Sequence, residues 1–200
     1  MSKWLSPELP FMVGYYGYLT MPIVTLLGIL YTYRFTKQGL FLVAIFSSFT
    51  LLSQILNGIL KKIFMQPRPK DQINITKHDE STHPNMGMPS GHSQSVAISL
   101  MFLYKTVPSQ IFRIVGTVIS VLTLLQRYLY RKHTLAQVVT GCLIGLLLGH
   151  IGYETHIWVK TKKIEMTRPI INIGFVLGIG LLVLCLLIDK SHIIEKMRKI

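Results

Sequence analysis

The sequence predicts an all-α integral membrane protein, a helical bundle of about six transmembrane helices with one long polar loop. Half of its 200 residues are hydrophobic, only 14% are charged, and its mean hydropathy is +0.46. A soluble domain could not form its surface from such a composition. Apolar runs close to the length of a bilayer core lie at residues 11–33, 39–60, 89–105, 110–127, 134–153 and 170–188. We expect residues 1–200 to form a single membrane-embedded domain.

The first run contains Pro22, which a transmembrane helix tolerates when neighbouring groups satisfy the freed backbone carbonyl. Tyrosines towards its two ends are expected to anchor it at the membrane interface, namely Tyr15, Tyr16, Tyr18, Tyr31 and Tyr33. No basic region or small-residue cleavage site accompanies this run. We therefore interpret it as a retained span and not as a signal peptide.

The second run carries polar side chains that we expect to face other helices, because lipid cannot satisfy them. They are Ser47, Ser48, Ser53, Gln54 and Asn57. The fifth run repeats a small residue every fourth position, at Gly141, Gly145 and Gly149, which predicts a seam of close helix packing. The sixth run has no charged residue and is expected to be scaffold.

The chain is strongly basic, with a net charge of +13 from 21 Lys and Arg against 8 Asp and Glu. These cations occur in short groups between apolar runs and form no continuous basic face, which argues against nucleic-acid binding. Contact with anionic headgroups and an anionic substrate explains them better. Cys142 and Cys185 lie inside apolar runs, so the sequence predicts neither a disulfide framework nor a cysteine metal site.

Residues 61–88 form the one long connection, and prolines and glycine interrupt it. Long loops in compact folds are often functional. If the six spans alternate across the bilayer, this loop and the connection 127–133 open on the same membrane face, together with both termini. Polar side chains from both connections can then meet in one site.

Three spaced cations among those on this face are candidates for holding a phosphate: Lys61, Arg68 and Arg127. Lys and Arg commonly end transmembrane helices by extending to the interface, so each alone is weak evidence of a site. Phosphoryl transfer, however, needs positive charge around the phosphate oxygens, together with a nucleophile and a proton for the leaving oxygen.

Ser90, Gly91 and His92 open the third span, where free backbone N–H groups and the helix dipole favour an anion. His133 stands at the start of the fifth span. Gln137 lies one turn further on the same side, within reach of its ring. Either histidine alone is better explained as a satisfied interfacial residue than as a catalytic one.

Taken together, three patterns resemble the type 2 phosphatidic acid phosphatase superfamily: Lys61-x6-Arg68-Pro69, Pro89-Ser90-Gly91-His92 and Arg127-x5-His133. The resemblance covers the polar motifs across 61–137. It implies a metal-independent enzyme without a cofactor, in which His133 is the nucleophile that forms a phosphohistidine and His92 is the general acid. It also implies that the substrate phosphate is held by Lys61, Arg68, Ser90, Gly91 and Arg127.

Two positions depart from that pattern: Gln126 replaces Ser, and Gln137 replaces Asp. A glutamine can orient His133 but cannot stabilise a cationic ring by its charge. From this we expect Gln137→Ala to lose about a hundredfold in activity, and Gln137→Glu to keep or raise activity. The departure also leaves open a catalytically inactive, lipid-binding homologue.

The runs Gln66-Pro-Arg-Pro and Gly87-Met-Pro-Ser-Gly-His-Ser-Gln94, together with Gln137, resemble the dolichyldiphosphatase branch. This implies hydrolysis of a polyisoprenyl diphosphate to the monophosphate, with a phosphatidate or lysolipid phosphatase of broad specificity as the alternative. The branch also implies an endoplasmic reticulum membrane in a eukaryote, or the plasma membrane in a bacterium, with a lumenal or extracytoplasmic site. Asn74 would then lie in a lumenal glycosylation sequon. The oligomeric state stays open.

The remaining histidines are not expected at the site. His78 and His83 lie in the charged loop, where a solvated loop is a better explanation than a metal site. His150 lies about 25 Å beyond His133 along one helix, too far to join it.

Overall fold

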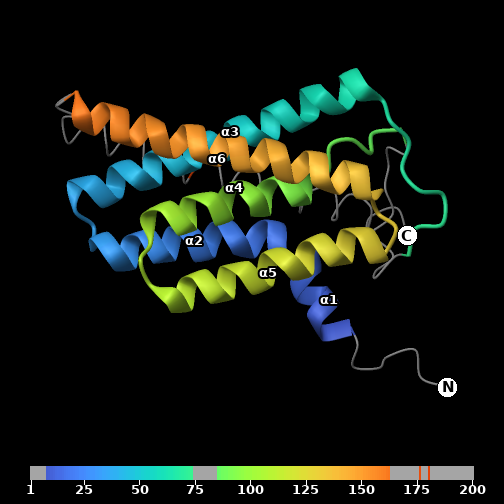
Figure 1. The fold of residues 1–200 in the computed structure, drawn as a ribbon, viewed down its shortest axis with the longest axis horizontal. Coiled ribbons are helices and arrows are strands. Elements are labelled where there is room, and N and C mark those ends of the chain that lie inside the picture. Colours follow the sequence, from blue (N-terminus) through green and yellow to red (C-terminus); the bar gives the residue numbers. More distant parts are fainter. Residues whose placement is uncertain (1–7, 74–84, 163–175, 177–179, 181–200) are drawn as a thin grey trace.

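A computed structural model describes residues 8–73 and 85–162, together with Val176 and Gly180. This part of the chain is helical and contains no strand, and its longer helices run in about the same direction (Figure 1). The helices are α1 (Glu8–Tyr15), α2 (Gly17–Tyr33), α3 (Lys37–Phe64), α4 (Gly91–Thr106), α5 (Gln110–Leu129) and α6 (Leu135–Thr161). Among them α3, α5 and α6 are long and apolar enough to cross a membrane, whereas α2 is apolar but shorter. The predicted all-α membrane bundle is confirmed.

The first predicted span, 11–33, is two helices and not one. The chain leaves the helical conformation at Tyr16, between α1 and α2, where φ is −85° and ψ is 2°. Glycines flank this break, and both lie against α5: Gly14 against the carbonyl of Leu122, and Gly17 against the side chain of Thr123. Since glycine is a poor helix former, the chain bends here at little cost and closes onto α5.

Pro22 lies inside α2, as expected, and its ring removes the N–H that would bond to the carbonyl of Tyr18. The hydroxyl of Ser95, from α4, donates to that carbonyl at 3.0 Å. The predicted compensation by a neighbouring helix is therefore confirmed.

The sixth predicted span, 170–188, lies outside the described residues apart from Val176 and Gly180. Asn74, His78 and His83 of the long loop also lie outside the described residues, as does Cys185.

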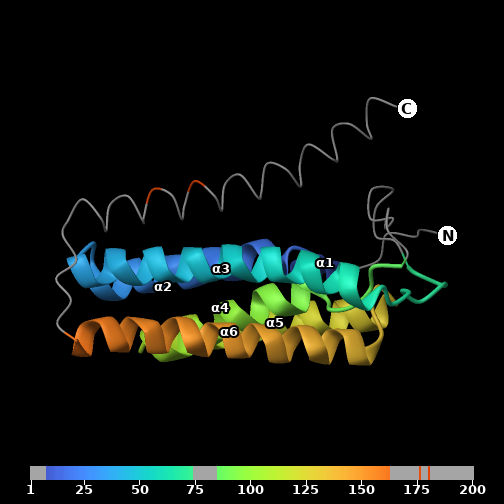
Figure 2. The same cartoon turned by 90° about the horizontal axis from the view of Figure 1, so that it is seen from above.

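Helix α4 is the centre of the described bundle, because it packs against α2, α3, α5 and α6. Figure 2 shows α1 to α3 in one layer and α5 with α6 in the other. The predicted glycine seam of α6 lies against α4. Gly141 faces the carbonyl of Ser90, and Gly145 faces that of Gln94. Backbone-to-backbone contact of this kind has no room for a side chain, so the packing role of the seam is confirmed.

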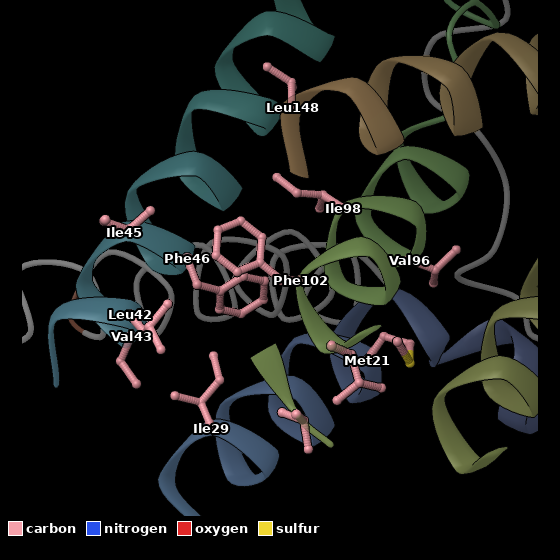
Figure 3. Packing of buried hydrophobic residues seen from close by; sticks show 12 residues of the cluster. Met21, Ile29, Leu42, Val43, Ile45, Phe46, Val96, Ile98, Phe102 and Leu148 are labelled. Atoms are coloured by element: carbon pink, nitrogen blue, oxygen red, sulfur yellow. The ribbon is translucent and has the colours of Figure 1, made fainter. Parts of the chain in front are cut away.

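The hydrophobic core lies between α2, α3, α4 and α6, with Phe46 and Phe102 at its centre (Figure 3). Their ring centroids are 5.1 Å apart and their planes are inclined by 60°, a favourable tilted arrangement. This core fixes the four helices relative to one another, and it thereby fixes the residues at their ends.

Helix termini that carry the sequence motifs lie together at one end of the bundle. The C-terminal ends of α3 and α5 and the N-terminal ends of α4 and α6 are all at the right-hand end of Figure 1, beside α1. The polar clusters from residues 61–137 thus face a common region, as alternation of the spans predicts.

Candidate active site

The site begins with a buried polar network that joins α3 to α4. Asn57 Nδ2 donates to Gln94 Oε1 at 2.8 Å and to the carbonyl of Pro89 at 3.3 Å. Gln94 Nε2 in turn donates to Ser53, at 2.8 Å to its carbonyl and 2.9 Å to its hydroxyl. Since every link is buried, the network holds the Pro89–Gly91 turn against α3 with little freedom.

The polar residues of the second predicted span form two groups, one buried and one exposed. Ser47, Ser53 and Asn57 are buried between helices, as expected, but Ser48 and Gln54 are exposed on the outer face of α3. The hydroxyl of Ser48 is satisfied by its own helix, through the carbonyl of Ala44 at 2.8 Å. The expectation was wrong for Ser48 and Gln54, because they lie on the other side of the helix.

Ser90 is the N-cap of α4, and its side chain is fully buried. Its Oγ accepts from the backbone N–H of Ser93 at 3.4 Å and from the Ser93 hydroxyl at 2.9 Å. Both contacts use Ser90 as an acceptor, so its own hydroxyl proton remains to be donated. The N–H of Ser90 donates to the carbonyl of Gln137 at 3.1 Å, which ties this turn to α6.

His133 is held beside Arg127 by a tight turn at the end of α5. The backbone N–H groups of Lys132 and His133 both donate to the carbonyl of Arg127, at 3.0 and 3.2 Å. Arg131 adopts a positive φ of 52° within this turn. The nucleophile predicted from the sequence and one of the three predicted cations are thus fixed relative to each other by the backbone.

The ring of His133 is buried and has a defined tautomer. Its Nδ1 lies 2.9 Å from the carbonyl of Gly87 and 3.2 Å from Oε1 of Gln137. Both neighbours can only accept, so Nδ1 carries the proton and the neutral ring has its lone pair on Nε2.

Gln137 connects four parts of the chain. Its Oε1 also accepts the N–H of Thr134 at 3.2 Å, as the third helical residue of a capping box. Its Nε2 donates to Oε1 of Gln66 at 3.0 Å and to the carbonyl of Pro67 at 2.9 Å. Because Pro67 offers only an acceptor and Thr134 only a donor, this orientation of the amide is the one that satisfies both.

The three predicted cations are near enough to both histidines to act on them through their charges. Lys61 is in the last turn of α3, Arg68 follows α3, and Arg127 is in the last turn of α5. Their positive charges act on the rings of His92 and His133. Burial, followed by the charges of Arg68, Arg127 and Lys61, lowers the pKa of His133 to about 3, although its hydrogen bond with Gln137 acts the other way. His133 is therefore neutral at physiological pH.

His92 is in the first turn of α4, and its ring lies against two tyrosines. The ring centroids of His92 and Tyr18 are 4.1 Å apart, and those of His92 and Tyr15 are 6.5 Å apart. The guanidinium carbon of Arg127 lies 5.2 Å from the centre of the Tyr15 ring. The expectation that these two tyrosines are interfacial anchors is corrected, whereas Tyr16 and Tyr31 are exposed as anchors would be.

Lys132 is almost fully buried next to His133, and no role was expected for it from the sequence. Gln126 is fully buried, and its amide has no hydrogen-bond partner among the described residues.

His150 lies apart on α6, 3.8 Å from Glu154. Within the described ranges no group of His, Cys, Asp and Glu side chains could hold a metal ion.

Fold and site together define a multi-pass helical membrane protein in which two histidines and three cations converge at one end of the bundle. A family model of the PAP2 superfamily matches residues 41–161. Since this is more than half of the chain, the protein belongs to the PAP2 superfamily, the type 2 phosphatidic acid phosphatases, and the resemblance seen in the sequence is confirmed.

Similar proteins include phosphatases that are named for different lipid substrates. The chain is 27% identical over 157 residues to a dolichyldiphosphatase of Saccharomyces cerevisiae, covering 72% of this chain and 62% of the relative. It is 28% identical over 138 residues to phosphatidylglycerophosphatase B of Bacillus subtilis, with 64% and 63% covered. A lipid A 4'-phosphatase of Porphyromonas gingivalis is 19% identical over 139 residues, with 67% and 59% covered. The chain thus spans about three fifths of the length of these relatives.

A solved structure has the same fold. It is the crystal structure of a transmembrane PAP2 type phosphatidylglycerolphosphate phosphatase from Bacillus subtilis, with a TM-score of 0.56 and 25% sequence identity, covering 84% of this chain and 82% of that one. The roles that the sequence suggests for individual residues stay predictions.

Proposed function

We propose that this protein is a membrane lipid phosphatase that cleaves a polyisoprenyl diphosphate, of the dolichyl type, to the monophosphate and inorganic phosphate. The orientation of the His133 ring is the observation that supports this proposal most directly. Its Nδ1–H is directed to Gly87 and Gln137, so its Nε2 lone pair is left for phosphorus in a site with three cations. A neutral imidazole held this way is a competent nucleophile at neutral pH.

In the proposed reaction, Nε2 of His133 attacks the terminal phosphorus, and an N–P bond forms as the bond to the bridging oxygen breaks. The electron pair leaves with that oxygen on the lipid monophosphate, and His92 supplies a proton to it. Water then attacks the phosphohistidine and gives its proton to His92, which releases inorganic phosphate and returns the lone pair to Nε2. Lys61, Arg68, Arg127, Ser90 and the N-terminus of α4 at Gly91 would hold the phosphate oxygens.

Two glutamines support the diphosphatase branch over the wider superfamily. Gln66 and Gln137 both belong to the motifs that resemble dolichyldiphosphatases, and they are hydrogen-bonded to each other at 3.0 Å. An aspartate at 137 would have no N–H for Gln66 or for the carbonyl of Pro67. The glutamine therefore suits its surroundings as part of a matched pair and does not by itself indicate a decayed site.

The second candidate is a phosphatidate, lysolipid or phosphatidylglycerophosphate phosphatase. Two comparisons favour it: the Bacillus subtilis phosphatidylglycerophosphatase B and the solved Bacillus subtilis structure, at 28% and 25% identity. The substrates differ in the leaving group. A lipid monophosphate, whose phosphate has a second pKa of about 6, is a better leaving group than an alkoxide, so protonation by the general acid assists both reactions but matters more for the second candidate.

Phosphate release by the purified full-length chain from dolichyl diphosphate and from phosphatidate separates the two. We expect dolichyl monophosphate and one inorganic phosphate per turnover, and a loss of about a thousandfold or more in His133→Ala. His150→Ala is the matched control and should keep full activity. Undiminished release by His133→Ala would overturn the nucleophile, and faster cleavage of phosphatidate would favour the second candidate.

For the orientation, we propose that the catalytic end of the bundle faces the lumen or the outside of the cell, in the endoplasmic reticulum or the bacterial plasma membrane. Spent isoprenyl diphosphate on that side would be the substrate. An N-terminal tag should then be protected from protease in sealed microsomes; digestion from the outside would reverse the orientation.

A further inference from the structure

Two tyrosines from the N-terminal helices form a wall beside the proposed active site. Tyr15 is the last residue of α1, and Tyr18 lies in the first turn of α2, on either side of the break at Tyr16. Tyr15 contacts the guanidinium of Arg127 on α5, and Tyr18 contacts the ring of His92 on α4. Both tyrosines lie outside residues 41–161, the part that matches the family model.

The backbone around Tyr15 and Tyr18 is in close contact with both α5 and α4. Gly14 and Gly17 press against α5 at Leu122 and Thr123, where any larger side chain would collide. On the other side, the hydroxyl of Ser95 from α4 bonds to the carbonyl of Tyr18 at 3.0 Å. The wall is therefore fixed relative to Arg127 and His92, so its rings can restrict the side chains of both.

Each contact suits a side chain that must stay oriented while it acts. An aromatic face attracts a guanidinium without accepting a conventional hydrogen bond from it, so the contact with Tyr15 orients Arg127 without itself using the N–H groups that suit phosphate oxygens. The Tyr18 ring packs against the His92 ring at a tilt of 50°, and this close contact restricts rotation of the imidazole. A proton donor held in one orientation transfers its proton at lower cost than a mobile one.

We propose that Tyr15 and Tyr18 are positioning residues for phosphoryl transfer, Tyr15 for Arg127 in phosphate binding and Tyr18 for His92 in proton transfer. This inference rests on the proposed function. It predicts a division of kinetic effects between the two positions, which a general loss of packing would not produce.

The test uses the purified full-length chain with farnesyl diphosphate as a short polyisoprenyl substrate and inorganic phosphate as a competing ligand. Tyr18→Leu should lower kcat by about tenfold or more, because general acid–base catalysis is worth at least that much. It should leave the inhibition constant of phosphate within about twofold of wild type. Tyr15→Leu should raise both KM and that inhibition constant by about tenfold, with a smaller effect on kcat.

Phe variants at both positions keep the ring and should lose clearly less than the Leu variants. They also provide a test if a Leu variant does not fold. Tyr31→Leu is the matched control, since Tyr31 is 70% exposed at the far end of α2. Equal losses in kcat and phosphate binding at both positions, no loss at either, or a Phe variant as impaired as Leu would overturn the inference. Wild type without activity, or an active His133→Ala, would instead overturn the proposed function.

Discussion

Gln137 Oε1 lies 3.2 Å from Nδ1 of His133, one helical turn away, while the other end of the same amide is bonded to Gln66 and Pro67. One side chain thus connects the predicted nucleophile to the loop that carries Arg68. The carbonyl of Gly87 lies closer to Nδ1, at 2.9 Å, and shares the task of orienting the ring. These two contacts change what the sequence alone leads one to expect of residue 137.

Gln137→Glu should lower activity, contrary to the expectation from sequence that it keeps or raises it. The buried carboxylate would lose both N–H donors and face the oxygens of Gln66 and Pro67, at a cost of about 1–3 kcal/mol or more in stability. Gln137→Ala should be milder, at about tenfold in kcat, because Gly87 still holds His133. Steady-state rates and thermal unfolding of both variants measure this order. Gln38→Glu, an exposed site at the start of α3, is the control; a Gln137→Glu enzyme as active as wild type would contradict the prediction.

Gly87→Ala should reduce kcat by about tenfold by disturbing how His133 is oriented. A β-carbon at position 87 would lie 2.5 Å from Nε2 of Gln137, so either the amide or the Gly87 carbonyl must move. Trapping of the phosphoenzyme with labelled substrate, together with kcat, detects the loss. Gly58→Ala is the matched control, since a β-carbon there meets nothing within 4 Å. Unchanged kcat in Gly87→Ala would show that this carbonyl does not orient the ring.

The acid limb of kcat/KM should reflect the low pKa of His133. Only the neutral ring can attack, and burial with the nearby cations lowers its pKa from 6.5 to about 3, so the nucleophile stays active as the pH falls well below 6.5. Arg68→Met removes one of these charges, which raises the pKa and moves the acid limb to higher pH. Wild type and variant are assayed with the same substrate, so ionisation of the substrate contributes equally to both pH profiles. The difference between the two profiles therefore reflects ionisation of the enzyme. Lys62→Met, an exposed neighbour of Lys61, should not shift the limb; an unmoved limb in Arg68→Met would refute the coupling.

Gly145→Leu should destabilise the bundle by several kcal/mol or prevent its assembly. The new side chain would press on the carbonyl of Gln94 and separate α4 from α6, and overpacking of this kind typically costs about 1–3 kcal/mol even where side chains can adjust. Thermal unfolding in detergent measures the change. Gly58→Leu, on an open face of α3, is the control. A Gly145→Leu protein as stable as wild type would mean that the seam does not need close contact.

The sequence by itself determined the class of the protein and the end of the bundle at which its motifs lie. Apolar runs of bilayer length follow directly from the need to satisfy every backbone group inside lipid. Alternation of the spans then places Lys61, Arg68, His92, Arg127 and His133 at one end without any knowledge of tertiary contacts. The glycine seam of α6 was equally accessible, because small residues at a spacing of four form one stripe on a helix.

Only the tertiary structure decided how each helix is rotated about its axis and which separate segments touch. Ser48 and Gln54 were expected to face inwards and lie outside, whereas Tyr15 and Tyr18 were expected at the interface and lie against Arg127 and His92. The contacts of Gln137 with Gln66 and Pro67 join residues about 70 positions apart. A hydrophobic pattern gives the length and the ends of a membrane helix, but in a polar or evenly apolar segment it does not specify the face that meets a neighbour. That choice is made by close packing between helices, as where Gly14 and Gly17 allow the chain to bend onto α5.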